Sequence, residues 1–373
     1  MADQGSRVAF VLGTSAGGVG RHVAMLAGGL VRGGHRVIVA GPPGTEEAFG
    51  FGDLGARFVP VPISDRPHPL NDLRAMRALR ALRGAHAVHA HGLRAGALAA
   101  LALTGTGTGL VVTLHNAATA GGAIGAVYSL LERIVARRAD RILVVSPDLG
   151  ERMAGLGARH VEAAVVPAPA PVPTGREPRE IREELGAGDR AVFLTVARLA
   201  QQKGLETLLE VAGAFGEGRA QELTRRPVFL VAGEGPLRGA LQGRIDRENL
   251  PVRLLGNRGD VEDLLRVTRA LLVPSRWEGQ PLNVQEALRA GTPVIATEVG
   301  GIPAMVGDAG LLVPYGDVGA MRDAIGRVLA DDDLVRALAG AAAGRGRELP
   351  GEEQAVNAVL AVYETLPPAD RRA

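Results

Sequence analysis

The sequence predicts an α/β protein made of two doubly wound domains, and two observations carry this prediction. Short apolar runs rich in β-branched residues alternate with longer segments of helical periodicity over the whole chain. Runs that are apolar almost throughout are typical of parallel strands in a sheet covered by helices on both faces. Five prolines between Pro167 and Pro178 interrupt this series with a stretch that suits a linker. We therefore expect two parallel sheets joined near residue 172.

The expected strands follow one another at short intervals. The segments between them are typical of helices, as in 21–34, where Val23, Leu26 and Leu30 share one face before two glycines end the helix. The strands are expected at 7–12, 35–40, 86–90, 110–114, 140–145 and 162–166, and then at 191–196, 228–233, 252–256, 270–274, 293–297 and 310–314.

Length and the proline-rich stretch divide the chain. A chain of 373 residues exceeds what one ordinary core supports. We expect a first Rossmann-like domain over 1–171, a second over 172–350, and a C-terminal helix within 351–373. Periodicity does not decide which domain this helix packs on, and a return to the first domain is one option.

The composition argues against several classes of protein. Lys and Arg number 42 against 40 Asp and Glu, and aromatic residues make up 3%, so neither charge nor stacking surfaces favour nucleic-acid binding. The chain has no cysteine, which excludes disulfides and thiolate metal sites. Its first residues resemble a strand more than a signal peptide, and its most apolar run, 95–103, is too short to cross a bilayer. We expect a soluble, cytoplasmic protein.

The first glycine-rich stretch follows the first strand, and ligands bind open parallel sheets at the carboxyl ends of strands. Its glycines at 13, 17, 18 and 20 lead into a helix, where backbone N–H groups could approach an anion. The spacing is not G-x-G-x-x-G, and no acidic residue follows the second strand, which disfavours an NAD enzyme. A tight turn that requires glycine is the alternative.

Histidines also follow strands in the first half. His86, His89 and His91 lie in one strand-end stretch, where His89 and His91 would point to the same side. A metal site would need a third ligand, and the spacing of His86 fits a strand poorly. His115 directly follows the next strand and is a pocket candidate, with capping or packing as the alternative.

A helix expected over 71–84 carries arginines at every third position. This spacing winds them around the helix, so that the basic stripe overlaps the leucines. The pattern favours a solvated face over a membrane-binding surface or a contact with an anionic or lipid-linked acceptor.

Cations and glycines follow strands in the second half. Arg198 and Lys203 lie in a loop before a helix, where a planar guanidinium and a compact ammonium suit a diphosphate. An ordinary charged loop could have the same composition. Gly233 to Gly235 form another glycine-rich turn. The three aspartates at 331–333 directly precede a helix, and acids at a helix N-terminus need no metal to explain them.

Glu278 and Glu286 form the most informative pair. The strand at 270–274 leads into a loop with Glu278, and Glu286 lies in the early turns of the helix that follows. The pair could serve as the acid and base of a hydrolase, as a metal site, or as a grip on a hydroxyl-rich ligand. Backbone N–H groups from Gly279 onward lie at a helix N-terminus, which favours anions and sugar oxygens.

Taken together, these residues resemble the retaining, two-domain GT-B glycosyltransferases, and specifically glycosyltransferase family 4. The resemblance rests on the E-x7-E element from Glu278 to Glu286, preceded by "VARLAQQKG" and "VAGEGP" and followed by "GGIPAMVGDAGLLVPYGD". It includes "GGVGRHVAMLAGGLVRGGHRVIV", "HAHG" and His115. It implies two Rossmann-like domains facing across a cleft, with the acceptor side in the first domain and the donor side in the second.

The resemblance also implies roles for the matching residues. Arg198 and Lys203 would hold the departing diphosphate, Glu278 the transferred sugar and Glu286 the donor ribose, while His115 would border the reacting sugar. His89 and His91 would lie on the acceptor side. The remaining donor-binding positions would be Gly17 and Gly18 at the diphosphate, Arg258 near the base, and Gly233, Glu234, Gly279, Gln280, Pro281 and Leu282.

By the same resemblance, the protein would be a metal-independent, retaining hexosyltransferase that needs no cofactor. It would move a sugar from a UDP- or GDP-type donor to a small-molecule, glycan or lipid-linked hydroxyl acceptor, with at most peripheral membrane contact. Gln280 departs from the aromatic or small residue common in the family, which leaves the identity of the sugar open.

Other functions remain as alternatives. A hydrolase would want aromatic platforms along its cleft, and only Trp277 is near the two glutamates. A phosphorylase would need a lysine-bound cofactor signature, which the sequence lacks. A nucleotide-sugar epimerase of similar fold and a non-catalytic nucleotide-sugar-binding protein are the closer alternatives.

Overall fold

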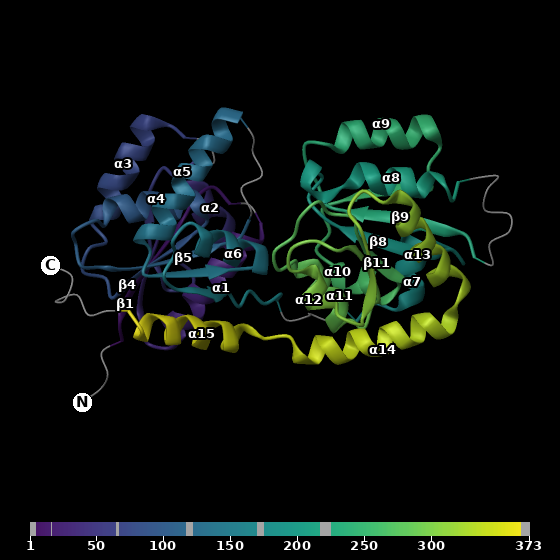
Figure 1. Cartoon of the computed structure of the whole chain (residues 1–373). Helices are drawn as coiled ribbons and strands as arrows, with labels where there is room; N and C mark the ends of the chain where they lie inside the picture. The colour runs from purple at the N-terminus through teal and green to yellow at the C-terminus, as the bar shows by residue number, and fades with distance from the viewer. Residues whose placement is uncertain are drawn as a thin grey trace. The chain divides into compact units, whose positions relative to one another are not determined.

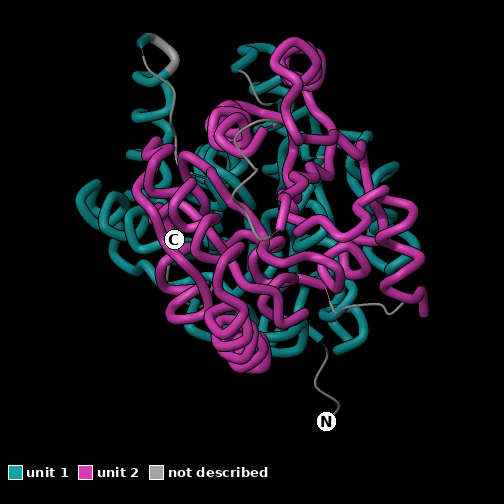
Figure 2. The backbone as a smooth tube through the Cα atoms, turned by 90° about the vertical axis from the view of Figure 1, so that its right-hand side faces the viewer, with its two compact units in different colours: residues 1–167, 350–373 teal, residues 168–349 magenta. Residues whose placement is uncertain are grey.

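The computed structural model of the chain describes residues 5–15, 17–64, 67–116, 122–169, 175–216 and 225–366. The chain divides into two compact units, Met1–Pro167 with Pro350–Ala373 and Ala168–Leu349, which Figure 2 shows in teal and magenta. The domain boundary expected between residues 171 and 172 lies outside the described residues.

The first unit is built on a parallel sheet in the order β3-β2-β1-β4-β5-β6-β7 (Figure 1). Helices cover both of its faces, with α3, α4 and α5 on one side and α1 and α15 on the other. The strands are β1 (Arg7–Leu12), β2 (Arg36–Gly41), β3 (Arg57–Pro60), β4 (Ala87–His91), β5 (Gly109–Leu114), β6 (Arg141–Val144) and β7 (Val161–Ala163). The helices are α1 (Gly18–Arg32), α2 (Pro43–Phe49), α3 (Pro69–Arg80), α4 (Leu93–Ala102), α5 (Gly122–Arg138), α6 (Pro147–Gly155) and α15 (Glu352–Glu364).

The second unit repeats this plan with a parallel sheet in the order β10-β9-β8-β11-β12-β13. The strands are β8 (Ala191–Val196), β9 (Pro227–Ala232), β10 (Val252–Gly256), β11 (Ala270–Val273), β12 (Val294–Thr297) and β13 (Gly310–Val313). The helices are α7 (Pro178–Glu184), α8 (Leu205–Gly213), α9 (Arg238–Glu248), α10 (Val261–Arg266), α11 (Leu282–Arg289), α12 (Ile302–Val306), α13 (Val318–Ala330) and α14 (Asp332–Glu348), with a 3-10 turn at Gln201–Lys203.

Strands that are apolar throughout supply a core on each side of the second sheet. Along β8, Phe193 packs into one cluster with residues of α8, α9 and α13, while Val192 and Leu194 pack into another with residues of α7, α10 and α11. Because successive side chains of a strand point to opposite faces of the sheet, β8 contributes residues to the core on each face, as a sheet covered on both faces requires. The predicted doubly wound α/β architecture is confirmed in both units.

One strand was not expected from the sequence. β3 at Arg57–Pro60 is the edge strand of the first sheet, and it pairs only with β2. It has four residues, its first and last are exposed, and it ends in proline. Because an edge strand needs neither a continuous apolar run nor every backbone donor, its pattern is weak. β7 is also shorter than expected, since it ends at Ala163.

The C-terminal helix α15 belongs to the first unit. It packs on α1, where Gly29 has so little space that a Cβ atom would lie 2.4 Å from Cγ2 of Val356. Ala355, Val359 and Tyr363 of α15 are buried. The chain thus returns to the first unit after completing the second, the option that periodicity alone left open.

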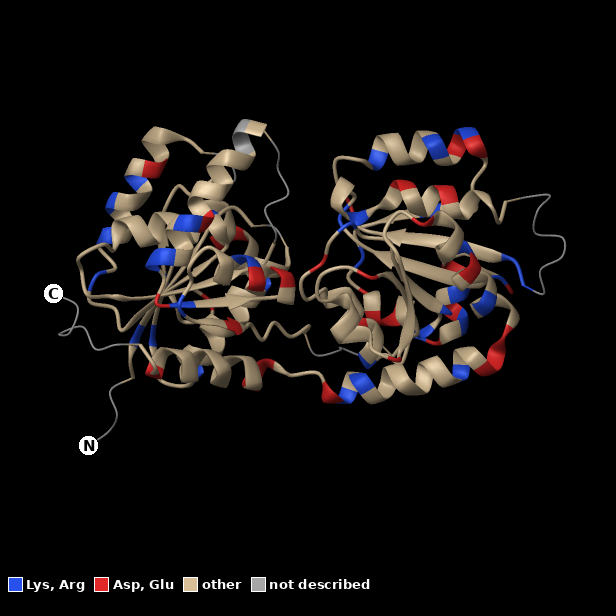
Figure 3. Cartoon of the chain, viewed as in Figure 1, with Lys and Arg blue, Asp and Glu red and all other residues tan. Residues whose placement is uncertain are grey.

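Charged residues at the surface helices α3 and α14 form hydrogen bonds with neighbouring backbone groups. The arginine-rich helix α3 buries Ala75 and Leu79, and Arg80 donates to the carbonyl oxygen of Ala102 at 3.0 Å. Figure 3 shows acidic and basic residues interspersed along the helices. Asp331 caps α14 by accepting a hydrogen bond from the backbone N–H of Leu334, in line with the expected N-terminal role of these aspartates. No helix among the described residues is long and apolar enough to cross a membrane.

Candidate functional site

Both sheets have a switch point at which the strand order reverses. In the first unit it lies between β1 and β4, and in the second unit between β8 and β11. Ligands bind α/β sheets outside the carboxyl ends of the strands at such a point. The loops after β8 and β11 carry Lys203 and Glu278, and the residues after β1 and at the end of β4 include Gly17 and His91.

Lys203 and Glu278 form an ion pair across the switch point of the second sheet. Lys203 Nζ donates to Glu278 Oε1 at 2.6 Å, and Ser275 Oγ donates to the same oxygen at 2.6 Å. The Glu278 side chain is 7% exposed and that of Lys203 is 24% exposed. Within the described residues, Glu278 Oε2 has no hydrogen-bond partner. The pair therefore presents one carboxylate oxygen and the remaining ammonium donors to a ligand.

Two glycines bring these loops close enough for the ion pair. Gly204 has a φ of 61°, and a Cβ atom there would lie 2.0 Å from the carbonyl oxygen of Pro274. Gly300 has a φ of 54°, and its Cβ would lie 1.9 Å from the carbonyl oxygen of Glu278. The backbone N–H of Gly301 donates to that same carbonyl at 3.0 Å. Glycine is required because side chains rarely adopt such φ values and would collide with the backbone.

Hydrogen bonds fix the loop that carries Glu278. Gln202 Nε2 donates to the carbonyl oxygen of Trp277 at 3.0 Å, and the N–H of Arg276 donates to the carbonyl oxygen of Gln202 at 2.8 Å. Thr297 Oγ1 donates to the carbonyl oxygen of Ser275 at 2.6 Å. Trp277 thus contributes its backbone carbonyl to the hydrogen bonds that fix the loop.

The predicted donor-binding stretch 279–282 leads into α11. Pro281 is the N-cap and Leu282 the first helical residue, while Gly279 is buried and Gln280 half-buried. The helix begins there because Pro281 has an extended φ and ψ and cannot donate a backbone hydrogen bond. The first N–H groups of α11 are the donors that a helix leaves for caps or ligands. Asn283 Nδ2 ties the helix to β8 by donating to the carbonyl oxygen of Val196 at 2.9 Å.

Glu286 lies one turn further along the same helix and is half-buried. Its neighbours Val284, Gln285, Ala287 and Leu288 are buried, so Glu286 sits at the edge of the buried face. The E-x7-E spacing therefore places one glutamate in the strand-end loop and the other on the helix that the loop opens.

Arg198 and the glycine turn at 233–235 lie beside each other. Arg198 is exposed and lies two residues after the end of β8. Gly233 has a φ of 139°, and its Cβ would lie 2.0 Å from the carbonyl oxygen of Ala197. The N–H of Leu199 donates to the carbonyl oxygen of Glu234 at 2.9 Å, while the Glu234 carboxylate pairs with Arg238 at 2.7 Å. The backbone hydrogen bond from Leu199 to Glu234 thus joins the loop after β8 to the glycine turn, and the Glu234 carboxylate is already paired with a cation.

Arg258 is held in a cluster of opposite charges. It donates twice to Asp260, at 2.8 and 2.6 Å, and once to Glu184 at 2.7 Å, and Arg176 pairs with both acids. These hydrogen bonds raise the pKa of Arg258 and lower the pKa of Asp260 and of Glu184. All three side-chain nitrogens of Arg258 already donate to acidic residues. The cluster therefore favours a structural role for Arg258 over the expected contact with the nucleobase of a donor.

In the first unit, the glycine-rich stretch enters α1. Gly17 is the N-cap, with a φ of −144° and a ψ of −143°, and a Cβ atom there would meet nothing described within 4 Å. Packing against the described residues therefore does not demand glycine at this position. Gly18 is the first residue of the helix, and the N–H of Gly20 donates to Ser15 Oγ at 3.0 Å.

His91, His115 and His22 form a compact cluster. His91 Nδ1 lies 3.0 Å from His115 Nε2, and their stacked rings have centroids 5.3 Å apart. The ring of His22, from α1, lies 5.6 Å from each of the other two rings. Burial lowers the pKa of His115 to about 4 and lowers the pKa of His22 and His91 well below their usual value. All three imidazoles are therefore neutral near pH 7.

His89, in contrast, is part of the interior. Its Nδ1 lies 2.7 Å from the hydroxyl oxygen of Tyr363 and its Nε2 lies 2.6 Å from Thr113 Oγ1. The side chain is fully buried, and burial lowers the pKa of His89 to about 3. Because both ring nitrogens have protein partners, its position favours packing over the expected acceptor contact.

Several residues that build the site were not predicted from the sequence. Ser275 and Thr297 are small polar residues without a distinctive pattern, although each closely follows or ends a strand. Gly204 could have been found, since a glycine after a short turn before a helix often adopts a positive φ. Tyr363 lies 274 positions from His89, a separation that no local pattern reveals.

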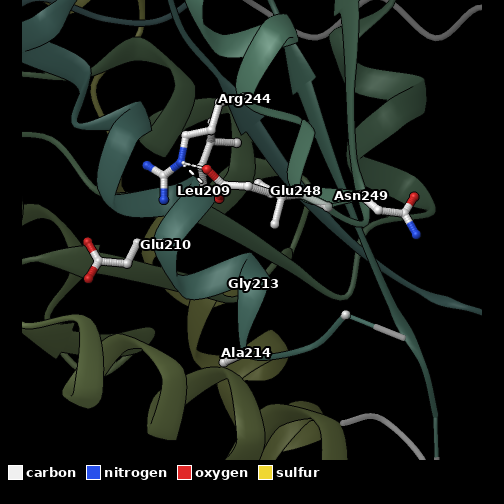
Figure 4. A pocket seen from close by; sticks show the side chains of 9 residues that line it. Leu209, Glu210, Gly213, Ala214, Arg244, Glu248 and Asn249 are labelled. Carbon is white, nitrogen blue, oxygen red and sulfur yellow. Dashed lines mark hydrogen bonds and ion pairs between the residues drawn. The ribbon is translucent and has the colours of Figure 1, made fainter. Parts of the chain in front are cut away.

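Two cavities of the second unit lie away from these residues. One of about 480 Å³ lies between α8 and α9, where Figure 4 shows Arg244 hydrogen-bonded to Glu248 beside Leu209. Another of about 460 Å³ lies at the amino ends of β8, β11 and β12. Neither contains a predicted site residue. Groups of three or more His, Cys, Asp or Glu able to hold a metal ion are absent from the described residues.

Two family models match the chain, one in each unit. A model described as a glycosyl transferase 4-like domain matches residues 17–169, and one described as glycosyl transferases group 1 matches residues 190–331. The first begins at Gly17, and the second contains every candidate residue of the second unit.

Curated relatives are about 30% identical to this chain over the segments that align. An alpha-D-kanosaminyltransferase of Streptomyces kanamyceticus is 30% identical over 164 residues, which is 42% of this chain and 40% of the relative. A D-inositol 3-phosphate glycosyltransferase of Corynebacterium jeikeium is 31% identical over 263 residues, covering 65% of this chain and 61% of the relative. The matches thus span roughly half the length of these relatives.

A solved structure extends the likeness in fold to nearly the whole chain. Anabaena HepE, in a complex with UDP and glucose, superimposes with a TM-score of 0.81 at 16% identity and covers 97% of this chain and 100% of its own. The expected GT-B fold is confirmed. With a glycosyl transferase 4-like domain followed by a glycosyl transferases group 1 domain, the chain belongs to the GT-B glycosyltransferases.

Proposed function

We propose that the protein is a retaining glycosyltransferase that moves a hexose from a nucleoside-diphosphate sugar to a hydroxyl group of an acceptor. The observation that carries this proposal is the Lys203–Glu278 ion pair at the switch point of the second sheet, with Glu278 Oε2 available to a ligand. A hydroxyl-rich ligand can donate to that oxygen, and an anionic ligand can accept from the lysine.

The chemistry requires stabilisation of a leaving diphosphate. The bond between C1 of the sugar and the diphosphate oxygen breaks, the acceptor oxygen forms a bond to C1, and the acceptor proton ends on the released nucleoside diphosphate. Arg198 is exposed and Lys203 retains donors beyond its bond to Glu278, so both can offset the charge that develops on the phosphate. We infer that these cations do the work that a metal ion does in other transferases.

The two glutamates would serve as a grip on the donor rather than as an acid and a base. Lys203 and Ser275 both donate to Oε1 of Glu278, so the carboxylate is fixed in place and its Oε2 can accept from a sugar hydroxyl. Glu286 on α11 would accept from the ribose hydroxyls. Anabaena HepE is described in a complex with UDP and glucose, which makes UDP-glucose the first donor to test.

The acceptor is proposed only by class. The D-inositol 3-phosphate glycosyltransferase named among the relatives acts, by its name, on a small hydroxylated molecule. A small-molecule, glycan or lipid-linked hydroxyl acceptor is consistent with the proposed reaction.

A donor panel tests the proposal. UDP- and GDP-sugars are scored by thermal shift and by slow hydrolysis of the donor, with wild type, Arg198→Ala and Glu286→Ala. Each substitution should weaken donor binding by about tenfold or more, since a charge-assisted hydrogen bond contributes about 1.5–3 kcal/mol. Arg247→Ala and Glu210→Ala, on exposed helix positions, are the matched controls and should bind like wild type.

The products separate the proposal from its alternatives. Released sugar or a transfer product with the donor's anomeric configuration supports it, and activity should persist in EDTA. An inverted product would remove the retaining assignment, and an epimerised donor would indicate an epimerase. If no nucleoside diphosphate sugar stabilises the wild type, the protein is not a transferase of this kind.

A further inference from the structure

The hydrogen bond between His91 and His115 has one proton, which lies on one of the two facing ring nitrogens. His91 Nδ1 and His115 Nε2 lie 3.0 Å apart, so one of these nitrogens donates and the other accepts. Both imidazoles are neutral near pH 7, because burial lowers the pKa of each. Each ring therefore carries a single N–H, and the direction of this hydrogen bond fixes the tautomer of both rings.

The surroundings of His91 decide the direction. His91 Nε2 is buried and has no hydrogen-bond partner in the part of the chain that the structure describes. If His115 were the donor, the only proton of His91 would lie on that nitrogen, as a buried N–H without an acceptor. If His91 donates, Nε2 carries only an unpaired lone pair. Buried N–H groups without a partner are rarer in proteins than acceptors without one, so the second arrangement is favoured.

We propose that His91 is a positioning residue of the site, which donates from Nδ1 to His115 Nε2 and thereby holds His115 as its Nδ1–H tautomer. His115 Nδ1 makes no hydrogen bond within the described residues and is left as a neutral donor for a ligand oxygen. This inference rests on the proposed function for its ligand, while the tautomer itself is a property of the free protein.

Rigid packing holds His91 in place for this role. Its ring stacks on His89 with centroids 4.3 Å apart and lies 5.6 Å from the ring of Phe10. His89 is itself anchored by Thr113 and by Tyr363 of α15. The C-terminal helix thus helps to hold His91 in place, because Tyr363 contacts His89 and His89 stacks on His91. Neither Tyr363 nor His89 titrates near neutral pH, since burial raises the pKa of Tyr363 and lowers the pKa of His89.

A neutral Nδ1–H has a specific chemical consequence. It can donate to a sugar hydroxyl or a phosphate oxygen without offering a base of ordinary strength, because its one lone pair already accepts from His91. His115 would then orient an oxygen rather than remove a proton from it.

Nitrogen chemical shifts of selectively 15N-labelled histidines test the inference on the free, full-length protein. Wild type should show His115 with its proton on Nδ1. His91→Phe keeps a ring of similar size but removes the donor, so His115 should shift toward the Nε2–H form that free imidazole side chains prefer. His91→Asn places an amide near the position of Nδ1 and should restore the Nδ1–H form.

The matched control is His86→Phe, which alters a histidine just before β4 that contacts the carbonyl oxygen of Tyr363 instead of His115. It should leave the His115 signals unchanged. A wild-type His115 already protonated on Nε2, or one whose tautomer is unaffected in His91→Phe, overturns the inference. If His91→Phe does not fold, the wild-type spectrum and His91→Asn still decide the question.

Kinetics add a readout that distinguishes positioning from packing. With UDP-glucose and GDP-mannose as probes of donor hydrolysis, His91→Phe should lower kcat by about tenfold, the value of one hydrogen bond, with little change in KM. His91→Asn should recover most of that loss. If wild type hydrolyses neither probe, the proposed function is in question while the tautomer measurement stands on its own.

Discussion

Burial gives His22, His89, His91 and His115 pKa values below those they have in an unfolded chain. Burial lowers the pKa of His115 to about 4 and that of His89 to about 3, and lowers the pKa of His22 and His91 as well. Below the ordinary histidine pKa of 6.5, an unfolded chain therefore binds protons that the folded chain does not. The free energy of unfolding should fall as the pH decreases from about 6.5 toward about 4.

This loss of stability should be confined to the first unit, because all eight histidines of the chain precede residue 161. Hydrogen exchange corrected for intrinsic rates, measured at pH 7 and at pH 5, should show weaker protection in β4, β5 and α1 at the lower pH. Strands β8 and β11 of the second unit serve as the internal control and should keep their protection. Equal losses in both units, or no loss in either, would contradict the pKa shifts and their cause.

At the scale of elements, the short turn at Gln201–Lys203 decides where the lysine of the site lies. Gly204 ends this turn with a φ of 61° and lies against the carbonyl of Pro274. Gly188, in the same unit, has a φ of 53° but open space around its Cβ position. Comparing an alanine substitution at each glycine therefore separates the cost of a left-handed backbone from the cost of a collision between Cβ and the neighbouring backbone.

Gly188→Ala should lower the free energy of unfolding by about 1–2 kcal/mol, the cost of a left-handed residue with a Cβ. Gly204→Ala should lower it further and should also weaken the binding of UDP or GDP, because the turn that carries Lys203 must move away from Pro274. Denaturant unfolding and calorimetric titration measure the two effects. Equal behaviour of the two variants in both measurements would show that the collision has no consequence for the site.

The elements also show what a sequence can predict. Apolar runs long enough to cross a covered sheet were predicted correctly, as at β1 and β8. The edge strand β3 escaped prediction because half of its pairing capacity faces away from the sheet, so its residues need not be apolar. The strand-end positions of Lys203 and Glu278 were predicted, and their direct ion pair was not, since it depends on Gly204 and Gly300 bringing two loops together.

For the whole molecule, a sheet of seven strands and a sheet of six, which share the order of their first six strands, each place candidate ligand-binding residues at a switch point. The alternation of strands and helices predicts a parallel sheet covered on both faces, which is why the doubly wound architecture was accessible from the sequence. Contacts between distant segments were not, as in the hydrogen bond between His89 and Tyr363, or in the ion cluster that occupies Arg258. Such contacts leave no periodic pattern in the chain.

The most direct measurement of the central claim is hydrogen exchange of the full chain with and without UDP and GDP. Binding of a nucleoside diphosphate should slow exchange in residues 198–204 and 278–286, and this protection should be lost in Glu286→Ala and kept in Glu210→Ala. If neither nucleotide protects these two segments, or if protection survives in Glu286→Ala, the strand-end loops of the second unit are not the donor site.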